Sequence, residues 1–292
     1  MTVILLDPLR PTTVPVEAVE FLGGPVEVTV EVPAPVRAWL PVGDGPAAVL
    51  VSTDPDHPDV RARIASGERV ISPPRVPGDR LVEAAAVMDR LWGFGGWEVT
   101  QTHDSLRRYL LEETYELLDA IGEGDPHGLR EELGDLLLQV LFHSRIAQES
   151  ASDPFTVDDV ACTLVTKLTL RSPHLSNGHT GPIDVAEQEA AWEVAKAAEK
   201  ARASCLDGIA MAQPALALAE KVIERATRAG LPADLVPAEL RVVRIGVGDN
   251  AEDALRKAVL AFVARIRAAE ARAREAGVGP GRLDGDAWMR FW

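Results

Sequence analysis

Hydrophobic and polar residues follow two different patterns along this chain, and the pattern changes near Arg80. Before that point, short alternating or β-branched runs are separated by thirteen of the chain's 21 prolines. After it, apolar residues recur every three or four positions, which is the spacing of amphipathic helices. We therefore expect a mainly α protein in which a small α/β domain at residues 1–80 precedes a helical bundle.

The first 80 residues predict four short strands and two helical segments. Pro and Gly residues bound the apolar runs, as they do at the ends of strands. This region contains no Gly-rich phosphate-binding loop and no cluster of His or Cys, so the sequence suggests no role for it. The expected strands are Val3–Leu6, Val26–Val32, Ala48–Ser52 and Arg69–Ser72, and the expected helical segments are Val16–Leu22 and Pro58–Ser66.

Clusters of Gly, Pro, Ser and Asp divide the rest of the chain into helices. We expect one helical domain at residues 81–230 and a C-terminal part at residues 231–292. Within that part, residues 233–250 are irregular and a polar tail follows a long helix. The expected helices are Leu81–Trp92, Ser105–Ile121, His127–Glu149, Thr156–Arg171, Val185–Ala203, one from Pro214 to about Gly230, and Asp253–Ala276.

Two of these helices, separated by one tight turn, carry matching sets of acidic residues. At about 100° per residue, each set covers an arc of about 100° on its helix. An i,i+3 pair on each helix can direct two carboxylates at one point, so an antiparallel hairpin would bring four oxygen ligands together. Such a donor set suits hard divalent cations, above all Mg²⁺ or Mn²⁺. The sets are Glu112, Glu113 and Glu116 on the first helix and Glu131, Glu132 and Asp135 on the second.

A solvated acidic face is the simpler interpretation of the first helix, because its leucines lie opposite the acids. The second helix argues against that interpretation, since apolar residues cover nearly its whole circumference. A helix that is apolar all round is expected to be buried, and buried carboxylates need a metal ion or a cationic partner. His143, on the second helix, is interpreted as structural. His103, His127, His174 and His179 are scattered along the chain and are interpreted as surface or capping residues.

Cationic and aromatic candidates follow downstream. Lys167 and Arg171 are an i,i+4 pair at the end of one helix, and Trp192 and Lys196 form another on the next. Alone, such residues are more often surface cations and packing aromatics. Beside a metal-loaded carboxylate cluster, cations can hold phosphate oxygens and a Trp ring can stack on a base.

Charge and composition limit the kinds of molecule that this protein is expected to bind. The 30 basic and 45 acidic residues give a net charge of −15, which repels the phosphate backbone of DNA and RNA. A small phosphorylated ligand held through a metal ion remains compatible with this charge. Two cysteines do not suggest a disulfide framework, and neither a secretory signal nor a membrane span is expected. We therefore expect a cytoplasmic protein that binds no nucleic-acid polymer.

The acidic residues stand in a recognisable order. Leu111-Glu112-Glu113-Thr114-Tyr115-Glu116, followed by Glu131-Glu132-Leu133-Gly134-Asp135, resembles the E-E-x-x-E and E-x-x-D signature of the all-α nucleoside triphosphate pyrophosphohydrolases. Trp97-Glu98-x-x-Gln101-Thr102 upstream, and Lys167-Leu168 with Arg171-x-Pro173-His174 downstream, narrow the resemblance to the MazG family. It covers roughly residues 82–230, and the N-terminal extension resembles that of actinobacterial, including mycobacterial, members.

The resemblance implies hydrolysis of the α–β bond of nucleoside or deoxynucleoside triphosphates, giving the monophosphate and pyrophosphate. It implies that Glu113, Glu116, Glu132 and Asp135 are the Mg²⁺ ligands, with Mn²⁺ a possible substitute, and that Glu112 lies behind them or orients the attacking water. Lys167, Arg171 and Lys196 would contact the triphosphate, and Trp192 the base or sugar. The family also implies a homodimer or higher oligomer that completes a four-helix bundle, and a role in cleaning the nucleotide pool.

Three departures from the family pattern stand out. Gly95-Gly96-Trp97-Glu98 replaces the frequent Cys-Pro-Trp-Asp, and Leu170–Arg171 replaces a basic pair. Residues 205–292 contain no second acidic hairpin, so we expect one active site per chain. A narrower dUTPase-like or phosphoribosyl-ATP-type pyrophosphohydrolase and a non-catalytic helical nucleotide-binding or scaffold protein remain as alternatives. Buried Glu132 and Asp135 would be a costly arrangement for a scaffold.

Overall fold

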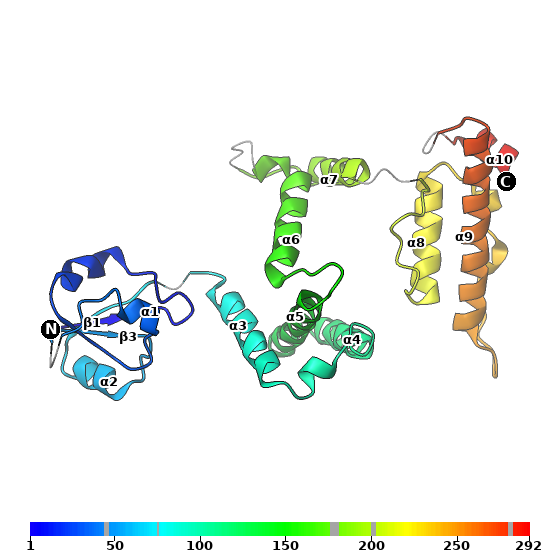
Figure 1. Cartoon of the computed structure of the whole chain (residues 1–292). Coiled ribbons are helices and arrows are strands. Elements are labelled where there is room, and N and C mark those ends of the chain that lie inside the picture. The colour runs from blue at the N-terminus through cyan, green and yellow to red at the C-terminus, as the bar shows by residue number, and fades with distance from the viewer. Residues whose placement is uncertain (44–46, 75, 176–180, 200–202, 280–282) are drawn as a thin grey trace. The chain divides into compact units, whose positions relative to one another are not determined.

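The computed structural model describes residues 1–43, 47–74, 76–175, 181–199, 203–279 and 283–292 (Figure 1). The chain forms two compact units, residues 1–165 and residues 166–292, and each is described by itself. No helix in the described ranges is both long enough and apolar enough to cross a membrane.

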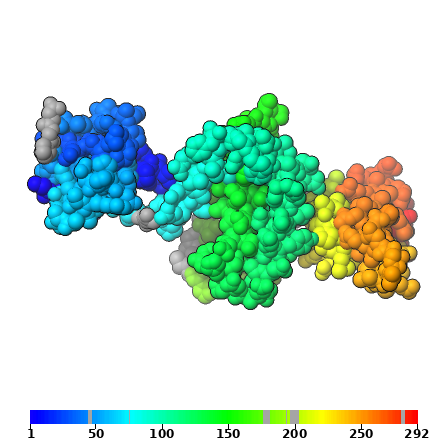
Figure 2. All heavy atoms as spheres, turned by 90° about the horizontal axis from the view of Figure 1, so that it is seen from below, coloured from blue at the N-terminus to red at the C-terminus, as the bar shows by residue number. Residues whose placement is uncertain are grey.

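The N-terminal part of the first unit is a four-stranded parallel sheet, in a body drawn in blue in Figure 2. The strand order is β2-β3-β1-β4, with Thr2 opposite both Val49 and Arg69. Alternate residues of the central strands enter two cores, Val3 packing with Val60 on one face and Ile4 with Ala18 on the other. The strands are β1 Thr2–Leu5, β2 Val26–Val28, β3 Val49–Ser52 and β4 Arg69–Ile71.

Three connections around this sheet are helical. The segment expected at Val16–Leu22 is a 3-10 helix, η1 Val16–Gly23, and α2 Pro58–Ala65 matches its expected range closely. The short helix α1 Ala34–Arg37 was not expected. The strand expected to reach Val32 ends at Val28. The N–H of Thr29 still donates to Val51 O, but the chain turns after Thr29, and Pro33 is the N-cap residue of α1.

Three helices follow in the same unit and share one core: α3 Asp79–Phe94, α4 Arg107–Glu123 and α5 Pro126–Gln148. Met88, Trp92 and Leu106 pack there with Leu141 and Phe142. The single 3-10 turn η2 Glu98–Thr100 lies between α3 and α4.

A two-residue connection joins α4 to α5. Gly124 ends α4 in the left-handed conformation, with φ 68°, which glycine adopts without a Cβ clash. Asp125 then caps α5, its carboxylate accepting from the N–H groups of His127 and Gly128 at 2.9 and 3.0 Å. Pro126 occupies the first helical turn, where no N–H donor is needed. This turn holds α4 and α5 together as a hairpin.

Helix α6 Val157–Arg171 leads out of the first unit, and η3 Pro173–Leu175 and α7 Val185–Glu199 follow it. The helix expected to reach Ala203 is thus described as far as Glu199.

The second unit has its own hydrophobic core, built by helices α8 Ala215–Arg228, α9 Ala251–Glu275 and α10 Gly285–Phe291. Phe262, Ile266 and Trp288 are fully buried in it. The core includes residues from Leu206 to Trp288, so the division expected between residues 230 and 231 falls inside one packed body.

Two predictions about the C-terminal part were wrong in detail. Residues 233–250 include two short 3-10 turns, η4 Ala233–Leu235 and η5 Ala238–Leu240. The expected polar tail contains α10, capped by Asp284 through the N–H of Ala287 at 2.9 Å. Trp288 holds α10 in the core, because its indole N–H donates to Ala229 O at 2.9 Å and its ring is fully buried.

Candidate active site on the α4–α5 hairpin

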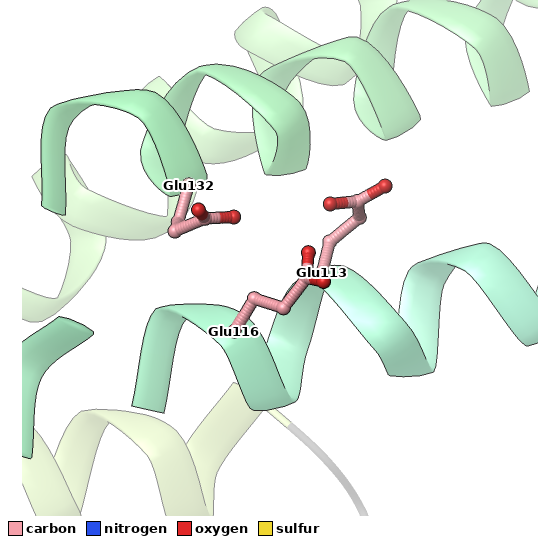
Figure 3. Close-up of side chains that lie close together, drawn as sticks. All are labelled: Glu113, Glu116 and Glu132. Carbon is pink, nitrogen blue, oxygen red and sulfur yellow. The ribbon is translucent and has the colours of Figure 1, made fainter. Parts of the chain in front are cut away.

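Three acidic side chains converge between α4 and α5. One carboxylate oxygen from each of Glu113, Glu116 and Glu132 can be chosen so that all three lie within 4.8 Å of one another. Figure 3 shows Glu113 and Glu116 extending from one helix and Glu132 from the other into the space between them. We call Glu113, Glu116 and Glu132 the acidic cluster.

The acidic cluster carries unbalanced negative charge. Burial, followed by the charges of Asp135 and Glu116, raises the pKa of Glu113 above its ordinary value. Burial and then the charges of Glu116, Asp135 and Glu131 raise the pKa of Glu132. Within the described residues, no Lys or Arg forms an ion pair with a member of the cluster. The carboxylates repel one another, and a bound cation would relieve that repulsion.

The other predicted acids lie beside this cluster. Asp135 is half-buried, and its charge acts on both Glu113 and Glu132, although its oxygens are not among the three that converge. Glu112 is exposed on α4 directly before Glu113. Glu131 is exposed and pairs with the His127 ring at 3.0 Å. The hairpin therefore gathers three of the four predicted ligands, with the fourth next to them.

The expectation that α5 is buried all round was wrong for the single chain. Leu133 is 52% exposed, and Leu138 and Val140 are also exposed. The physical reason is that, among the described residues, the side of α5 with Leu141 and Phe142 packs into the core shared with α3 and α4, whereas these three residues remain outside that core. Glu113 and Glu132 are consequently half-buried rather than sealed from solvent.

The predicted substrate-contacting residues fall at the end of α6 and on α7, in the second unit. Lys167 is half-buried on α6, and the Arg171 guanidinium lies 5.2 Å from the ring centre of Trp192. The structure thus brings Arg171 and Trp192 together in a cation–π contact. The side chain of Lys196 lies outside the described residues. Contact of these residues with a substrate stays a prediction.

Sequence reasoning missed a second polar feature, formed by α5 and the loop before α4. His103 and His143 were treated as unrelated, yet their Nδ1 atoms lie 2.8 Å apart. Gln139, one turn before His143 on α5, is buried. A signal was present in the sequence, because Asp135, Gln139 and His143 are spaced four residues apart and form one polar stripe on a largely apolar helix.

The residues present fit a hard divalent cation. All donors are carboxylate oxygens, the ligand type that Mg²⁺ and Mn²⁺ prefer. Neighbouring oxygens on one octahedral Mg²⁺ ion are about 3 Å apart and opposite ones about 4.2 Å apart. The three cluster oxygens lie within 4.8 Å of one another, so rotation of the side chains would have to bring them closer together to hold one ion.

Comparison with protein families places this hairpin in a known domain. Residues 101–176 match the MazG nucleotide pyrophosphohydrolase domain, which includes both acidic helices, and residues 1–71 match the MazG N-terminal domain. The chain belongs to the MazG family. The parallel sheet therefore belongs to the MazG N-terminal domain, and the acidic hairpin belongs to the MazG nucleotide pyrophosphohydrolase domain.

Curated relatives agree with this assignment. A nucleoside triphosphate pyrophosphohydrolase of Mycobacterium tuberculosis is 55% identical over 276 residues, covering 92% of this chain and 84% of the relative. One of Mycolicibacterium smegmatis is 50% identical, covering all of this chain and 96% of the relative. A nucleoside triphosphate pyrophosphohydrolase of Escherichia coli is 40% identical over 137 residues, which covers 46% of this MazG chain and 51% of that relative.

Proposed function

We propose that this MazG protein hydrolyses nucleoside and deoxynucleoside triphosphates to the monophosphate and pyrophosphate, with Mg²⁺ as the physiological cofactor. The observation that carries the proposal is the acidic cluster: three carboxylates within 4.8 Å, with pKa values raised at Glu113 and Glu132. It lies within the segment that matches the pyrophosphohydrolase domain. The names of the mycobacterial relatives support the same reaction class.

Each acidic residue has a distinct task in this proposal. Glu113, Glu116, Glu132 and Asp135 hold the cation, which when bound neutralises phosphate charge and lowers the pKa of water. Glu112, exposed beside Glu113, accepts a proton from the attacking water and orients it. No Ser, Cys or His belongs to the cluster, and in this proposal the carboxylates bind the cation while water attacks directly, without a covalent intermediate.

The downstream cations would fix which phosphate bond breaks. Lys167, Arg171 and Lys196 hold the outer two phosphates as the leaving group, and the Trp192 ring contacts the base or sugar. Water then attacks on the inner side of these phosphates, at the α-phosphorus. We further propose that the enzyme acts as a homodimer or higher oligomer in the cytoplasm and removes unwanted nucleotides from the pool.

Pyrophosphate release from a panel of nucleoside and deoxynucleoside triphosphates, with and without Mg²⁺, tests the reaction. Glu132→Gln removes a ligand and should lower turnover by at least about 100-fold, because loss of metal binding removes several kcal/mol of transition-state stabilisation. Glu123→Gln, at the exposed end of α4, is the matched control and should keep wild-type turnover.

The products distinguish this scheme from others. Hydrolysis in ¹⁸O-labelled water should place the label on the nucleoside monophosphate. Nucleoside diphosphate and orthophosphate as the main products would refute the scheme. Wild-type turnover in a folded Asp135→Asn variant would remove Asp135 from the ligand set.

A further inference from the structure

A pair of histidines connects the loop before α4 to α5. Nδ1 of His103, in the loop, lies 2.8 Å from Nδ1 of His143 on α5. The two ring planes are 10° apart, and the ring centres are 5.1 Å apart. This separation of the centres is close to the Nδ1–Nδ1 distance plus the radii of the two rings, so both Nδ1 atoms lie near the line between the centres. The rings therefore meet edge to edge, and a hydrogen bond between the two nitrogens is almost straight.

Of the two rings, His143 is the more enclosed. Its Nε2 atom is shielded from solvent and has no hydrogen-bond partner among the described residues, whereas His103 is exposed. A protonated imidazole has an N–H donor on both nitrogens. At His143, one of these donors would have no acceptor in the described part of the chain, and the other would point at His103. Burial, and then the charge of His103, accordingly lowers the pKa of His143.

Charged groups on the elements around the pair interact with partners other than His143. These interactions include Asp104 in the loop with Arg107 of α4, Asp89 of α3 and Glu149 with Arg145 of α5, Arg80 with Glu83 of α3, Arg108 with Tyr109 of α4, and Asp159 with Thr156 at the start of α6. Asp135 lies about two turns before His143, and its charge acts on the acidic cluster. Within the described residues, His103 is the one charged group that acts on the pKa of His143. The two rings themselves therefore set the proton balance of the pair.

The number of protons on the pair decides whether the two nitrogens can stay together. While both rings are neutral, one Nδ1 donates and the other accepts. One added proton charges the exposed His103, whose Nδ1–H then donates to Nδ1 of the neutral His143 in a stronger, charge-assisted bond. In this state His143 holds its own proton on Nε2, so a second proton can bind only at its Nδ1. Two N–H donors and two positive charges would then face each other at 2.8 Å, and the rings must separate.

His103 belongs to a compact turn directly before α4. Ser105 Oγ accepts from the N–H of Thr102 at 2.9 Å, and Thr102 Oγ1 accepts from the N–H of Ser105 at 3.1 Å. Leu106, at the end of the turn, is 1% exposed and packs in the core shared by α3, α4 and α5. The Leu106 side chain thus anchors one end of the turn, and the contact of His103 with His143 holds its middle on α5. Separation of the rings would loosen the turn.

We propose that His103 and His143 form an acid-sensitive latch, which holds the turn before α4 on α5 while the pair carries at most one added proton and releases the turn when both rings are charged. In the unfolded chain this contact is absent, so both histidines take up protons at the ordinary His pKa. The latch therefore contributes fully to stability above that pKa, and its contribution is lost as pH falls through the lowered pKa of His143. The latch does not depend on which reaction the acidic cluster catalyses.

A pH titration of the histidine rings in the full chain, followed by ¹H–¹³C NMR, tests the proton balance. The variants His103→Ala and His143→Asn assign the two signals. We expect His143 to titrate below the ordinary His pKa, and we expect its pKa to rise in His103→Ala, because the neighbouring charge is removed. A His143 ring that titrates at the ordinary pKa in the wild type, or whose pKa is unchanged in His103→Ala, would overturn the proposal.

Amide hydrogen exchange tests the release of the turn. The amides of Thr102, Ser105 and Leu106 are all hydrogen-bonded within the turn. Their protection, corrected for the intrinsic effect of pH on exchange, should fall by at least about tenfold between a pH above the titration of both rings and a pH below it. Amides in the middle of α5 should keep their protection over the same change of pH, because the helix itself does not depend on the latch.

His143→Asn separates the latch from a general effect of acid. The Asn side chain keeps an oxygen acceptor near the place of Nδ1 but cannot be charged, so protection of the turn should be the same at both pH values. His127→Gln, at an exposed position in the first turn of α5, is the matched control and should lose protection as the wild type does. Unchanged protection in the wild type as His143 takes up its proton, or an equal loss in wild type and His143→Asn, would contradict the latch.

Discussion

Single carboxylates determine how the site responds to pH. Glu113 and Glu132 have pKa values raised by burial and by neighbouring negative charges, so protons and metal ions compete for the same oxygens. The unfolded chain lacks this crowding, which makes the folded pKa higher than the unfolded one. Their protonation therefore stabilises the fold below the unfolded pKa, and this stabilisation is lost as pH rises through the folded pKa.

Two opposite pH trends follow for the protein with and without metal. Between about pH 5 and about pH 8, above the ordinary Glu pKa, the metal-free protein should lose the part of its stability that comes from protonated Glu113 and Glu132. Over the same range, Mn²⁺ affinity should rise, because fewer protons compete for the oxygens. Thermal melts and Mn²⁺ titrations at both pH values measure the two trends.

The Glu132→Gln variant is the control for this prediction. It removes one titrating carboxylate and should reduce the pH dependence of the metal-free melting temperature. An unchanged pH dependence in this variant, or Mn²⁺ affinity that is independent of pH in the wild type, would contradict it.

Much of the acidic cluster could be predicted because helical spacing is local information. The residues at i and i+3 on each helix place Glu113, Glu116 and Glu132 on facing sides once a two-residue turn joins α4 to α5. The His103–His143 contact could not be predicted in the same way. It depends on where the loop before α4 folds back onto α5, which no spacing along one helix specifies.

At the scale of elements, the backbone just after α8 passes very close to the backbone just before α10. Gly230 has φ 86°, and a Cβ at this position would lie 2.8 Å from the carbonyl oxygen of Leu283, just before α10. Backbone atoms cannot move aside as easily as the end of a flexible side chain. The docking of α10 on α8 therefore depends on glycine at this position.

Gly230→Ala should destabilise the second unit by more than about 2 kcal/mol, since the left-handed conformation alone costs about 1–2 kcal/mol and the contact with Leu283 adds to it. Gly277→Ala is a matched control, because Gly277 has φ 83° but no atom within 4 Å of a Cβ. Chemical denaturation followed by Trp fluorescence compares the two. Equal losses of unfolding free energy in Gly230→Ala and Gly277→Ala would show that the close approach to Leu283 adds no destabilisation.

The elements predicted best are those with the longest periodic pattern. The spacing in α4, α5 and α9 extends over several turns, and their predicted bounds differ from the observed ones by a few residues. Short elements were predicted less well. The four residues of α1 carry no repeat. The seven residues of α10 are too few to show a clear period, and polar Asp286 and Arg290 lie on either side of the buried Trp288.

At the scale of the whole molecule, the uncovered side of the hairpin indicates self-association. Leu111 is 60% exposed on α4, and Leu118, Ile121 and Leu133 are also more than half exposed. Several large apolar side chains exposed on one hairpin are typical of an interface. Together with the family expectation, it predicts a homodimer or higher oligomer.

Light scattering coupled to size exclusion should show a dimer or larger species at micromolar concentration. Leu118→Glu places a charge on this surface and should shift the protein toward the monomer. Leu216→Glu, at a comparably exposed position on α8, is the control and should leave the mass unchanged. A wild-type monomer would contradict the prediction.

The parallel sheet has a consequence for the order of folding. β1 is the first strand in the chain and an inner strand of its sheet, yet both of its neighbours come much later, with Thr2 opposite Val49 and Arg69. The acidic hairpin needs only a two-residue turn to close. Loop closure over longer sequence separations is slower, so the hairpin should gain protection before β1 does. Pulsed hydrogen exchange during refolding would detect this order. Amides of α4 and α5, which carry the acidic cluster, should become protected before amides of β1, although β1 is synthesised first.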